Sequence, residues 1–220
     1  IPAFNEEANI GLTIQGLQKI EEVKQIIVVD DGCSDNTALI AKKMGAKVIS
    51  HRVNKGKGHA LNTGAPFVQG DSVALVDADL RETVQEIRKL IAPVIQGGCD
   101  MAIAVFPPAR KKGGMGLVKG AAFWGLKLLT RREFKAPLSG QRVMSRKVFL
   151  SLLPFASGFG VEVGMTIDAW LNGYRLMEVE AQMQHEETGR DLAGFLHRGV
   201  QFKDVFLTLT KKGWRRWALS

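Results

Sequence analysis

Short unbroken runs of apolar residues alternate with stretches of helical period through the first 106 residues. The runs are expected to form strands at 1–4, 25–30, 46–50, 73–76 and 99–106. The stretches between them predict helices that cover 10–20, end near Met44, and span 59–68 and 82–95. Continuous apolar runs of this length are typical of strands buried on both faces of a parallel sheet. The alternation therefore predicts an α/β fold with a mostly parallel central sheet flanked by helices.

The second half of the chain has a different pattern. Helices are expected at 117–129, at 147–153, at 195–209 and directly after 157–160. The segment 176–183 alternates apolar and polar residues, which predicts a strand half exposed to water, and 139–142 is expected in a loop or at a strand edge. Because neither a repeat nor a linker is visible, we expect a single domain with two functional halves, 1–106 and 107–220.

The run at 73–76 leads to two carboxylates, Asp77 and Asp79, where the strand is expected to end. Successive side chains of a strand alternate between faces, so these two should point the same way. In an open α/β sheet, ligands lie beyond the carboxyl ends of the strands. Such a pair suits Mg²⁺ or Mn²⁺, which binds one or two protein carboxylates together with substrate phosphate oxygens. Alone it is a weak signal, because similar pairs also cap helices.

A basic glycine loop at 54–58 indicates a phosphate site but matches neither of two common phosphate motifs. Gly56 and Gly58 begin a dinucleotide fingerprint, yet Leu61 occupies the place of the third glycine. A P-loop is excluded because His51 stands where its first glycine belongs. A second basic run at 110–114 is explained as well by a solvated surface loop as by a lid.

Composition narrows the class of protein. With 45% hydrophobic and 24% charged residues, the chain has the makeup of a globular protein. Its net charge of +8 points to anionic partners, which include nucleotides, phosphorylated acceptors, nucleic acid and membrane surfaces. Cys33 and Cys99 form no disulfide framework or zinc spacing, which favours a reducing, cytoplasmic setting. No signal peptide or membrane-spanning run is visible. The first strand is so short that we expect the natural chain to begin earlier.

Four motifs follow one another in a characteristic order. They are Pro-Ala-Phe-Asn-Glu-Glu from Pro2, Asp-Asp-Gly-Cys-Ser-Asp from Asp30, Lys-Gly from Lys57, and Asp-Ala-Asp from Asp77. Together they resemble the family-2-like glycosyltransferases of the GT-A (Rossmann-like) fold over nearly the whole chain. The Gly-Lys-Gly segment from Gly56, Pro-Leu-Ser-Gly from Pro137 and the segment 154–164 resemble glucosyl-3-phosphoglycerate synthases, with polyprenyl-phosphate sugar transferases as near relatives.

The resemblance implies a metal-dependent hexosyltransferase. Glucose would move from UDP-glucose to a phosphorylated or carboxylated acceptor such as 3-phosphoglycerate, with Mg²⁺ or Mn²⁺ as cofactor. Residues 1–106 would bind the nucleotide-sugar and 107–220 the acceptor. The nucleotide-sugar residues implied are Pro2, Phe4, Glu6, Asp31, Lys57, Asp77 and Ala78. Lys57 would meet the diphosphate, Asp77 would lie between sugar and metal, and Asp79 with His185 would hold the metal.

Glu162 and Asp77 are the expected catalytic residues. Burial of Glu162 on an apolar helix would raise its pKa, as an acid/base residue requires, although a glutamate at a helix start is also stabilised by the helix dipole. Inverting relatives use a carboxylate near this position as a base, whereas glucosyl-phosphoglycerate synthases retain configuration, so the stereochemistry stays open. The acceptor-side candidates are Ser139, Gly140, Arg142 and Arg190, with Arg198 as a further phosphate contact.

Two other readings remain. One is a polyprenyl-phosphate glycosyltransferase that uses a UDP- or GDP-sugar, because Ser-Gly-Gln-Arg from Ser139 is closer to those enzymes. The other is a basic nucleotide- or membrane-binding module without catalysis, based on Trp214 and Trp217. A nucleic-acid partner is not expected, because the basic residues are scattered and no stacking platform is visible. The oligomeric state is left open, a homodimer included, and peripheral contact with a membrane is a further alternative.

Overall fold

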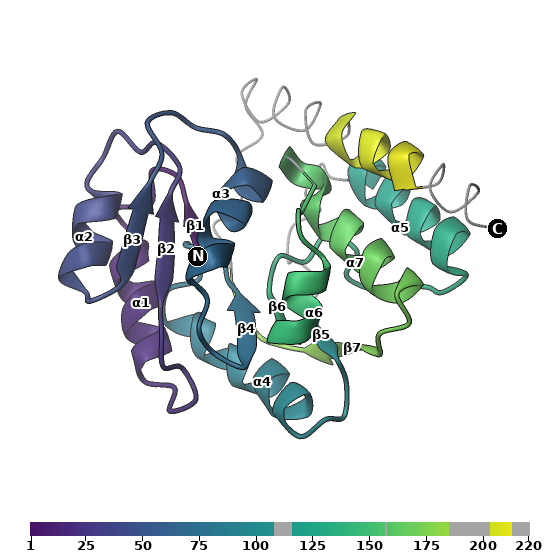
Figure 1. Cartoon of the computed structure of the whole chain (residues 1–220), viewed down its shortest axis with the longest axis horizontal. Coiled ribbons are helices and arrows are strands. Elements are labelled where there is room, and N and C mark those ends of the chain that lie inside the picture. The colour runs from purple at the N-terminus through teal and green to yellow at the C-terminus, as the bar shows by residue number, and fades with distance from the viewer. Residues whose placement is uncertain (108–115, 157, 185–202, 213–220) are drawn as a thin grey trace.

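A three-stranded parallel sheet forms the N-terminal side of the computed structural model, which describes residues 1–107, 116–156, 158–184 and 203–212. Its strands, in spatial order, are β1 (Pro2–Ala3), β2 (Ile27–Asp30) and β3 (Lys47–Ser50). Helices α1 (Ile10–Gln18) and α2 (Thr37–Lys43) lie beside it (Figure 1). Ile10 and Ile14 of the predicted apolar stripe are fully buried against Val28 and Ala41 in this part of the core.

A second sheet of four strands has the order β4-β6-β5-β7. Its strands are β4 (Ser72–Leu75), β5 (Met101–Val105), β6 (Arg142–Ser145) and β7 (Leu176–Glu180). β5 and β7 are parallel, whereas β6 runs antiparallel to both of its neighbours. The expected α/β architecture is thus confirmed, with one reversed strand, β6, whose first residue, Arg142, was expected in a loop or at a strand edge. The two functional halves were expected to divide at residue 106. Along the chain, the three-stranded sheet ends with β3 and the four-stranded sheet begins with β4.

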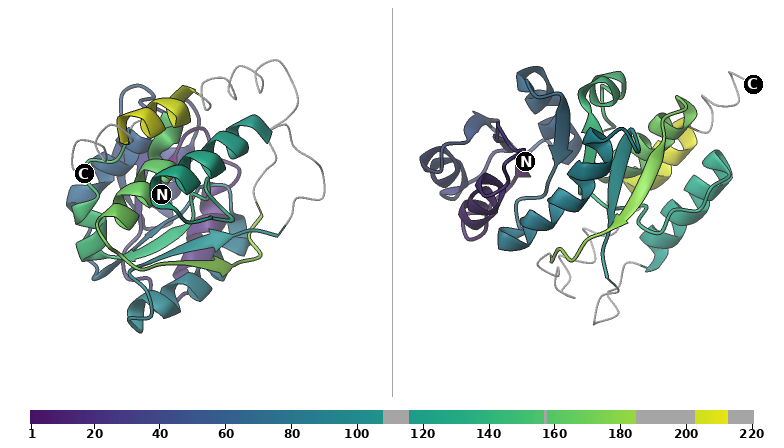
Figure 2. Two further views of the ribbon diagram at one scale, coloured as in Figure 1. Left: turned by 90° about the vertical axis from the view of Figure 1, so that its right-hand side faces the viewer. Right: turned by 90° about the horizontal axis from the view of Figure 1, so that it is seen from below.

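Helices cover both faces of the four-stranded sheet. Met101 and Ile103 of β5 point into a core with α5 (Gly116–Thr130) and α7 (Val161–Leu171), while Ala102 and Ala104 point to α4 (Arg88–Ile95). This is the two-residue alternation of a strand. The right-hand view of Figure 2 shows α4 and α5 on opposite sides of the sheet.

Three expected helices are divided or shifted. The helix predicted at 59–68 is α3 (Lys57–Gly64) followed by the 3-10 turn η1 (Ala65–Phe67), because Pro66 lacks the amide that would continue the helix. The helix predicted at 82–95 is the 3-10 segment η2 (Arg81–Ile87) and then α4. Residues 203–212 are helical, while the start of the helix predicted at 195–209 lies outside the described residues.

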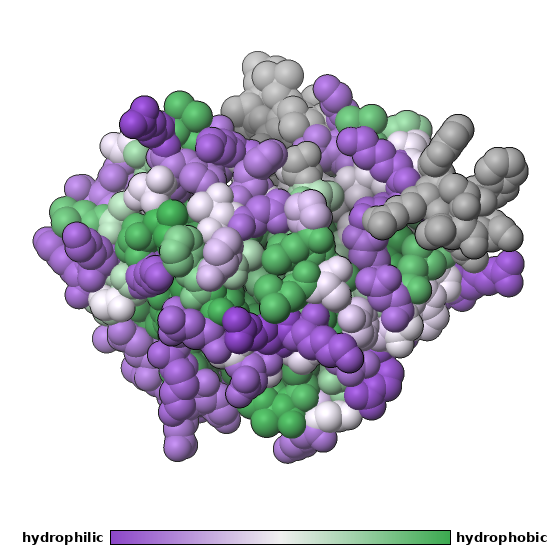
Figure 3. Space-filling view, viewed as in Figure 1, coloured by the Kyte–Doolittle hydropathy of each residue, from purple (hydrophilic) through white to green (hydrophobic). Residues whose placement is uncertain are grey.

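The remaining elements complete the C-terminal side. They are α6 (Arg146–Ser151) and the 3-10 turn η3 (Gly158–Gly160). Polar side chains cover most of the face in Figure 3, with apolar groups between them. No helix among the described ranges is long and apolar enough to cross a membrane.

Candidate active site at the sheet ends

Three charged side chains and one amide meet beyond the end of β4. Lys57 opens α3, Asp77 follows β4, and Glu162 lies in the first turn of α7. The Nζ atom of Lys57 is 2.6 Å from Oδ1 of Asp77 and 2.8 Å from Oε1 of Glu162. Gln141, directly before β6, donates from Nε2 to Oδ2 of Asp77 at 2.7 Å. We call these four residues the Lys57 cluster; it brings together three of the predicted site residues and Gln141.

Opposite charges keep Lys57 protonated in a partly enclosed place. Burial disfavours the ammonium, but attraction by Asp77 and Glu162 outweighs burial, so the pKa of Lys57 is raised well above its ordinary value. The side chain of Glu162 is 8% exposed and that of Asp77 is 26% exposed. Lys57 therefore neutralises two carboxylates that are little exposed to water. It is also the residue that the resemblance expects to contact the diphosphate.

Asp31 organises the basic glycine loop. Its Oδ1 accepts from the backbone N–H of Lys55 at 2.9 Å and lies 2.7 Å from Nδ1 of His51, while its Oδ2 accepts from the N–H of Gly56 at 2.7 Å. Both carboxylate oxygens are engaged by the protein, and the residue is buried. A contact between Asp31 and a base or ribose stays a prediction; Oδ2, which accepts one of the three bonds described, has a second lone pair for it.

Asp79 lies in a turn rather than on a strand. β4 ends at Leu75, so the strand alternation that predicted parallel carboxylates does not extend to Asp79. The turn is held from α1, because Thr13 donates its hydroxyl to the carbonyl of Ala78 and accepts from the N–H of Arg81, each at 2.8 Å. Asp79 is half-buried there, two residues beyond Asp77.

The predicted metal pair is described only in part. His185 lies outside the described residues, and within the described ranges no three histidine, cysteine, aspartate or glutamate side chains come together. The oxygens of a half-buried carboxylate such as Asp79 suit Mg²⁺ and Mn²⁺ alike. Of the predicted metal ligands, the described residues therefore supply one, a carboxylate whose oxygens fit a divalent cation.

Of the acceptor-side candidates, Gly140 is the one drawn into the Lys57 cluster. A Cβ added at Gly140 would lie 2.5 Å from Nζ of Lys57 and 2.9 Å from Oδ2 of Asp77. Ser139 is buried. Arg190 and Arg198 lie outside the described residues.

Arg142 requires a correction. It is 0% exposed, so it cannot contact an acceptor in this conformation, contrary to the prediction. Burial lowers the pKa of its guanidinium to about 10. Its Nε donates to the carbonyl of Ser139 at 2.9 Å and one terminal nitrogen donates to Oγ1 of Thr166 at 2.9 Å. Arg142 thus braces the loop that precedes β6 against α7.

The remaining predicted nucleotide-sugar residues lie along β1 and the turn after it, and in the Asp77 turn. Pro2 is in β1, Phe4 is 47% exposed, Glu6 accepts from Nδ2 of Asn9 at 2.8 Å, and Ala78 is buried. Nothing in these positions tests their predicted contact with a nucleotide.

Gln141 and His51 are the site residues that the sequence pattern missed. Gln141 lies in the Ser-Gly-Gln-Arg motif that begins at Ser139. It was not singled out because a glutamine is uncharged and its amide does not by itself indicate catalysis. His51 follows the strand at 47–50, which is where strand-end chemistry is expected. Its second ring nitrogen lies 2.9 Å from Oγ1 of Thr63, so it joins Asp31 to α3.

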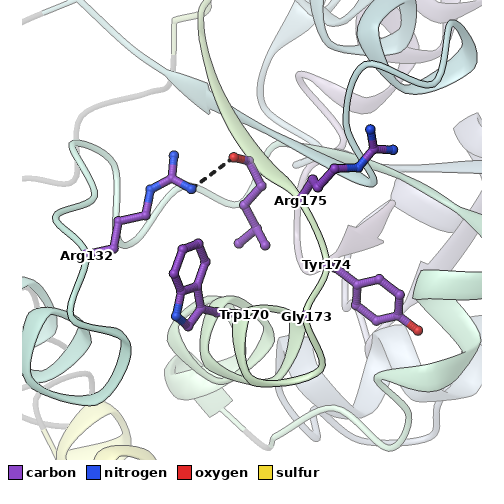
Figure 4. A pocket seen from close by; sticks show the side chains of 6 residues that line it. Arg132, Trp170, Gly173, Tyr174 and Arg175 are labelled. Carbon is purple, nitrogen blue, oxygen red and sulfur yellow. Dashed lines mark hydrogen bonds between the residues drawn. The ribbon is translucent and has the colours of Figure 1, made fainter.

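A separate cavity of about 350 Å³ opens at the other end of α7. Figure 4 shows Arg132 and Trp170 on one side of it and Tyr174 and Arg175 on the other. Both guanidinium groups are engaged, that of Arg132 by the carbonyl of Leu176 and that of Arg175 by Asp100. Trp170 lies eight residues beyond Glu162, about 12 Å along the helix. The cavity is therefore not part of the Lys57 cluster.

The chain is similar in sequence to proteins of a known family. The family model described as glycosyl transferase family 2 matches residues 1–138. An uncharacterized protein of Methanocaldococcus jannaschii is 40% identical over 134 residues, which cover 59% of this chain and 55% of that protein. Glucosyl-3-phosphoglycerate synthase of Mycobacterium tuberculosis is 32% identical over 193 residues, covering 77% of this chain and 59% of that enzyme. Bactoprenol glucosyl transferase of Shigella phage SfX is 30% identical, with coverage of 70% and 54%.

Solved structures give the same picture. The M. tuberculosis synthase in complex with Mn²⁺, UDP-glucose and phosphoglyceric acid matches with a TM-score of 0.79 and 30% identity, over 96% of this chain and 77% of that chain. The expected GT-A fold is thereby confirmed. The chain spans less than two thirds of the length of the curated relatives named above. By its matched residues and its fold, this chain belongs to glycosyl transferase family 2.

Proposed function

We propose that this chain transfers glucose from UDP-glucose to an anionic acceptor such as 3-phosphoglycerate, in a reaction that depends on a divalent metal. The observation that carries the proposal is the Lys57 cluster, in which a lysine at the start of α3 is held between Asp77, after β4, and Glu162, in the first turn of α7. The related M. tuberculosis synthase has been solved with Mn²⁺, UDP-glucose and phosphoglyceric acid, which supports the choice of donor, metal and acceptor.

Lys57 and the loop before it would bind the diphosphate. The loop leads directly into the N-terminus of α3, where backbone N–H groups and the helix dipole favour an anion. Lys57 would leave one of its carboxylate partners for the diphosphate, as a point charge on a flexible stem. Asp79, together with His185, would hold the metal. That metal, when bound, supplies positive charge against the developing charge of the departing nucleoside diphosphate.

Asp77 and Glu162 would handle the sugar and the acceptor. In the transfer, the bond from the anomeric carbon to the diphosphate oxygen breaks, a bond to an acceptor hydroxyl oxygen forms, and that hydroxyl loses its proton. Asp77, fixed beside Lys57, can accept hydrogen bonds from sugar hydroxyls. Glu162 faces the same place and serves as sugar anchor or as proton acceptor, and the anomeric outcome stays open between these roles.

A lipid-linked acceptor is the second candidate. The bactoprenol glucosyl transferase of phage SfX is the observation in its favour. With a polyprenyl phosphate as acceptor, peripheral membrane contact would follow, and the exposed Trp124 and Leu128 on α5 supply apolar surface for it. Trp214 and Trp217 lie outside the described residues. A homodimer stays a prediction for either acceptor.

Calorimetric titration with UDP and with GDP, each with and without Mn²⁺, tests the donor. We expect UDP to bind about tenfold or more tightly with Mn²⁺ than without it, because a cation held by Asp79 would supply positive charge to the diphosphate. Preference for GDP would contradict the choice of UDP-glucose. Incubation of UDP-glucose with 3-phosphoglycerate or with a short polyprenyl phosphate would then separate the two acceptor classes.

Substitution of Gly140 by alanine should impair the site without unfolding the chain. The added methyl group would fall within 3 Å of Lys57 and Asp77, both flexible side-chain ends, so they would shift apart. We expect initial rates of transfer to fall about 10- to 100-fold, while stability falls by about 1–3 kcal/mol at most. Gly120→Ala on α5 is the matched control, because a Cβ there meets no described atom within 4 Å beyond its own helix backbone and chain neighbours. Equal rates for the two variants would contradict this account.

A further inference from the structure

The amide of Gln141 holds Asp77 by two hydrogen bonds. Its Nε2 donates to Oδ2 of Asp77 at 2.7 Å, and its Oε1 accepts from the backbone N–H of the same residue at 3.0 Å. A backbone N–H can only donate, which fixes the amide oxygen on that side and leaves the amide nitrogen for the carboxylate. The orientation of the amide is therefore determined by chemistry.

The clamp is rigidly mounted. Gln141 is 0% exposed, and its backbone carbonyl accepts from the N–H of Ala104 on β5 at 3.0 Å. The next residue, Arg142, is equally buried and holds the carbonyl of Ser139. Gln141 thus stands at the start of the reversed strand β6, between two neighbouring strands of the sheet.

Two groups among the described residues contact different oxygens of the Asp77 carboxylate. Lys57 lies against Oδ1 and Gln141 donates to Oδ2, so both help to orient the carboxylate. The two contacts should respond differently to substrate. The proposed diphosphate would attract the flexible ammonium of Lys57 away from Asp77. The amide of Gln141 is uncharged and buried, so the diphosphate would not displace it.

We infer that Gln141 is a positioning residue that keeps the Asp77 carboxylate aimed at the hydroxyl groups of the donor sugar when Lys57 turns to the diphosphate. The inference rests on the proposed function. It assigns Gln141 no contact with substrate; its effect passes through Asp77. The positioning role also explains why an amide is buried beside the Asp77 carboxylate. An apolar side chain at position 141 would remove the donor that Oδ2 has now.

The test replaces Gln141 by methionine, which has nearly the same length and no amide. We expect kcat/KM for transfer from UDP-glucose to fall about 10- to 100-fold, the loss of one hydrogen bond to a charged group. The affinity for UDP with Mn²⁺ should stay within about twofold, because UDP lacks the sugar that Asp77 addresses. In the crystal structure of the variant without ligand, the Asp77 carboxylate should leave its present orientation.

Gln25→Met is the matched control. Gln25 makes the same kind of two-bond clamp, with Nε2 donating to the carbonyl of Phe67 and Oε1 accepting from the N–H of Gln69, but it joins backbone segments away from the Lys57 cluster. Its loss should lower stability and leave kcat/KM unchanged.

Three results would decide the matter. A parallel loss of UDP and UDP-glucose affinity in Gln141→Met would mean a general structural role and would overturn the inference. An unchanged Asp77 carboxylate in the variant's crystal structure would overturn it as well. A wild-type chain that bound neither ligand would contradict the proposed function instead, and the carboxylate orientation would still decide the role of Gln141.

Discussion

Asp79→Ala should reduce metal-dependent transfer from UDP-glucose by about 10³-fold, the largest loss of activity we expect from one substitution. The physical reason is that a divalent cation offsets the charge of the leaving diphosphate, and Asp79 is the half-buried carboxylate in the turn where the cation would bind. Initial rates at saturating Mn²⁺, with UDP binding by calorimetry at several Mn²⁺ concentrations, measure the effect.

Asp71→Ala serves as the control for Asp79→Ala. Asp71 is an exposed carboxylate that precedes the opposite end of β4, so its removal should change neither rate nor metal dependence. A folded Asp79→Ala protein that kept full Mn²⁺-dependent transfer would refute the proposed metal site.

Lys57→Met should damage both stability and activity. Without the ammonium, the carboxylates of Asp77 and Glu162 remain together in a partly enclosed place, and removal of one partner of a buried ion pair costs about 3–5 kcal/mol. Partial exposure of Asp77 places the expected loss near the lower value. Transfer should fall by about 10²-fold or more, because the diphosphate loses its cation. Urea unfolding at pH 7 and steady-state rates give the two numbers.

The pH dependence follows from the direction of the shift. The pKa of Lys57 is raised in the folded chain, so the stability that Lys57 contributes is fully present below its unfolded value of 10.5 and is lost only as the pH rises beyond it. The difference in stability between wild type and Lys57→Met should therefore be constant from pH 7 to pH 9. Lys89→Met is the control: its exposed pair with Glu86 should contribute less than about 1 kcal/mol. Equal losses for both lysines would contradict the importance of the Lys57 cluster.

Charged residues that lie in motifs of characteristic order could be predicted as site residues. Residues whose role depends on how the chain folds around them could not. Lys57, Asp77 and Glu162 come from three distant motifs, and the structure brings them within ion-pair distance. Arg142 was assigned to an acceptor because a guanidinium beside glycine suits an anion. Nothing in the residue order shows that β6 starts there and turns its side chain under α7.

β6 itself shows the same limit for the fold. The strands of the first half were predicted because each is a continuous apolar run. β6 has only four residues, begins with arginine, and reverses direction between β4 and β5. Pairing between strands that lie more than 60 positions apart along the chain, such as Leu75 with Arg142, leaves no trace in local periodicity.

The hydrogen bonds from Asp31 to the loop before α3 have a consequence for the thermodynamics of donor binding. Lys55 and Gly56 are already hydrogen-bonded to Asp31, directly after β2, and Gly32 at φ +77° lies against Val53 and Asn54 with no room for a side chain. The loop is therefore held in shape without a nucleotide. The loop thus loses its backbone entropy when the chain folds and not when the donor binds. Association with a diphosphate should consequently be limited by collision and by the exchange of counterions, with little delay from loop rearrangement.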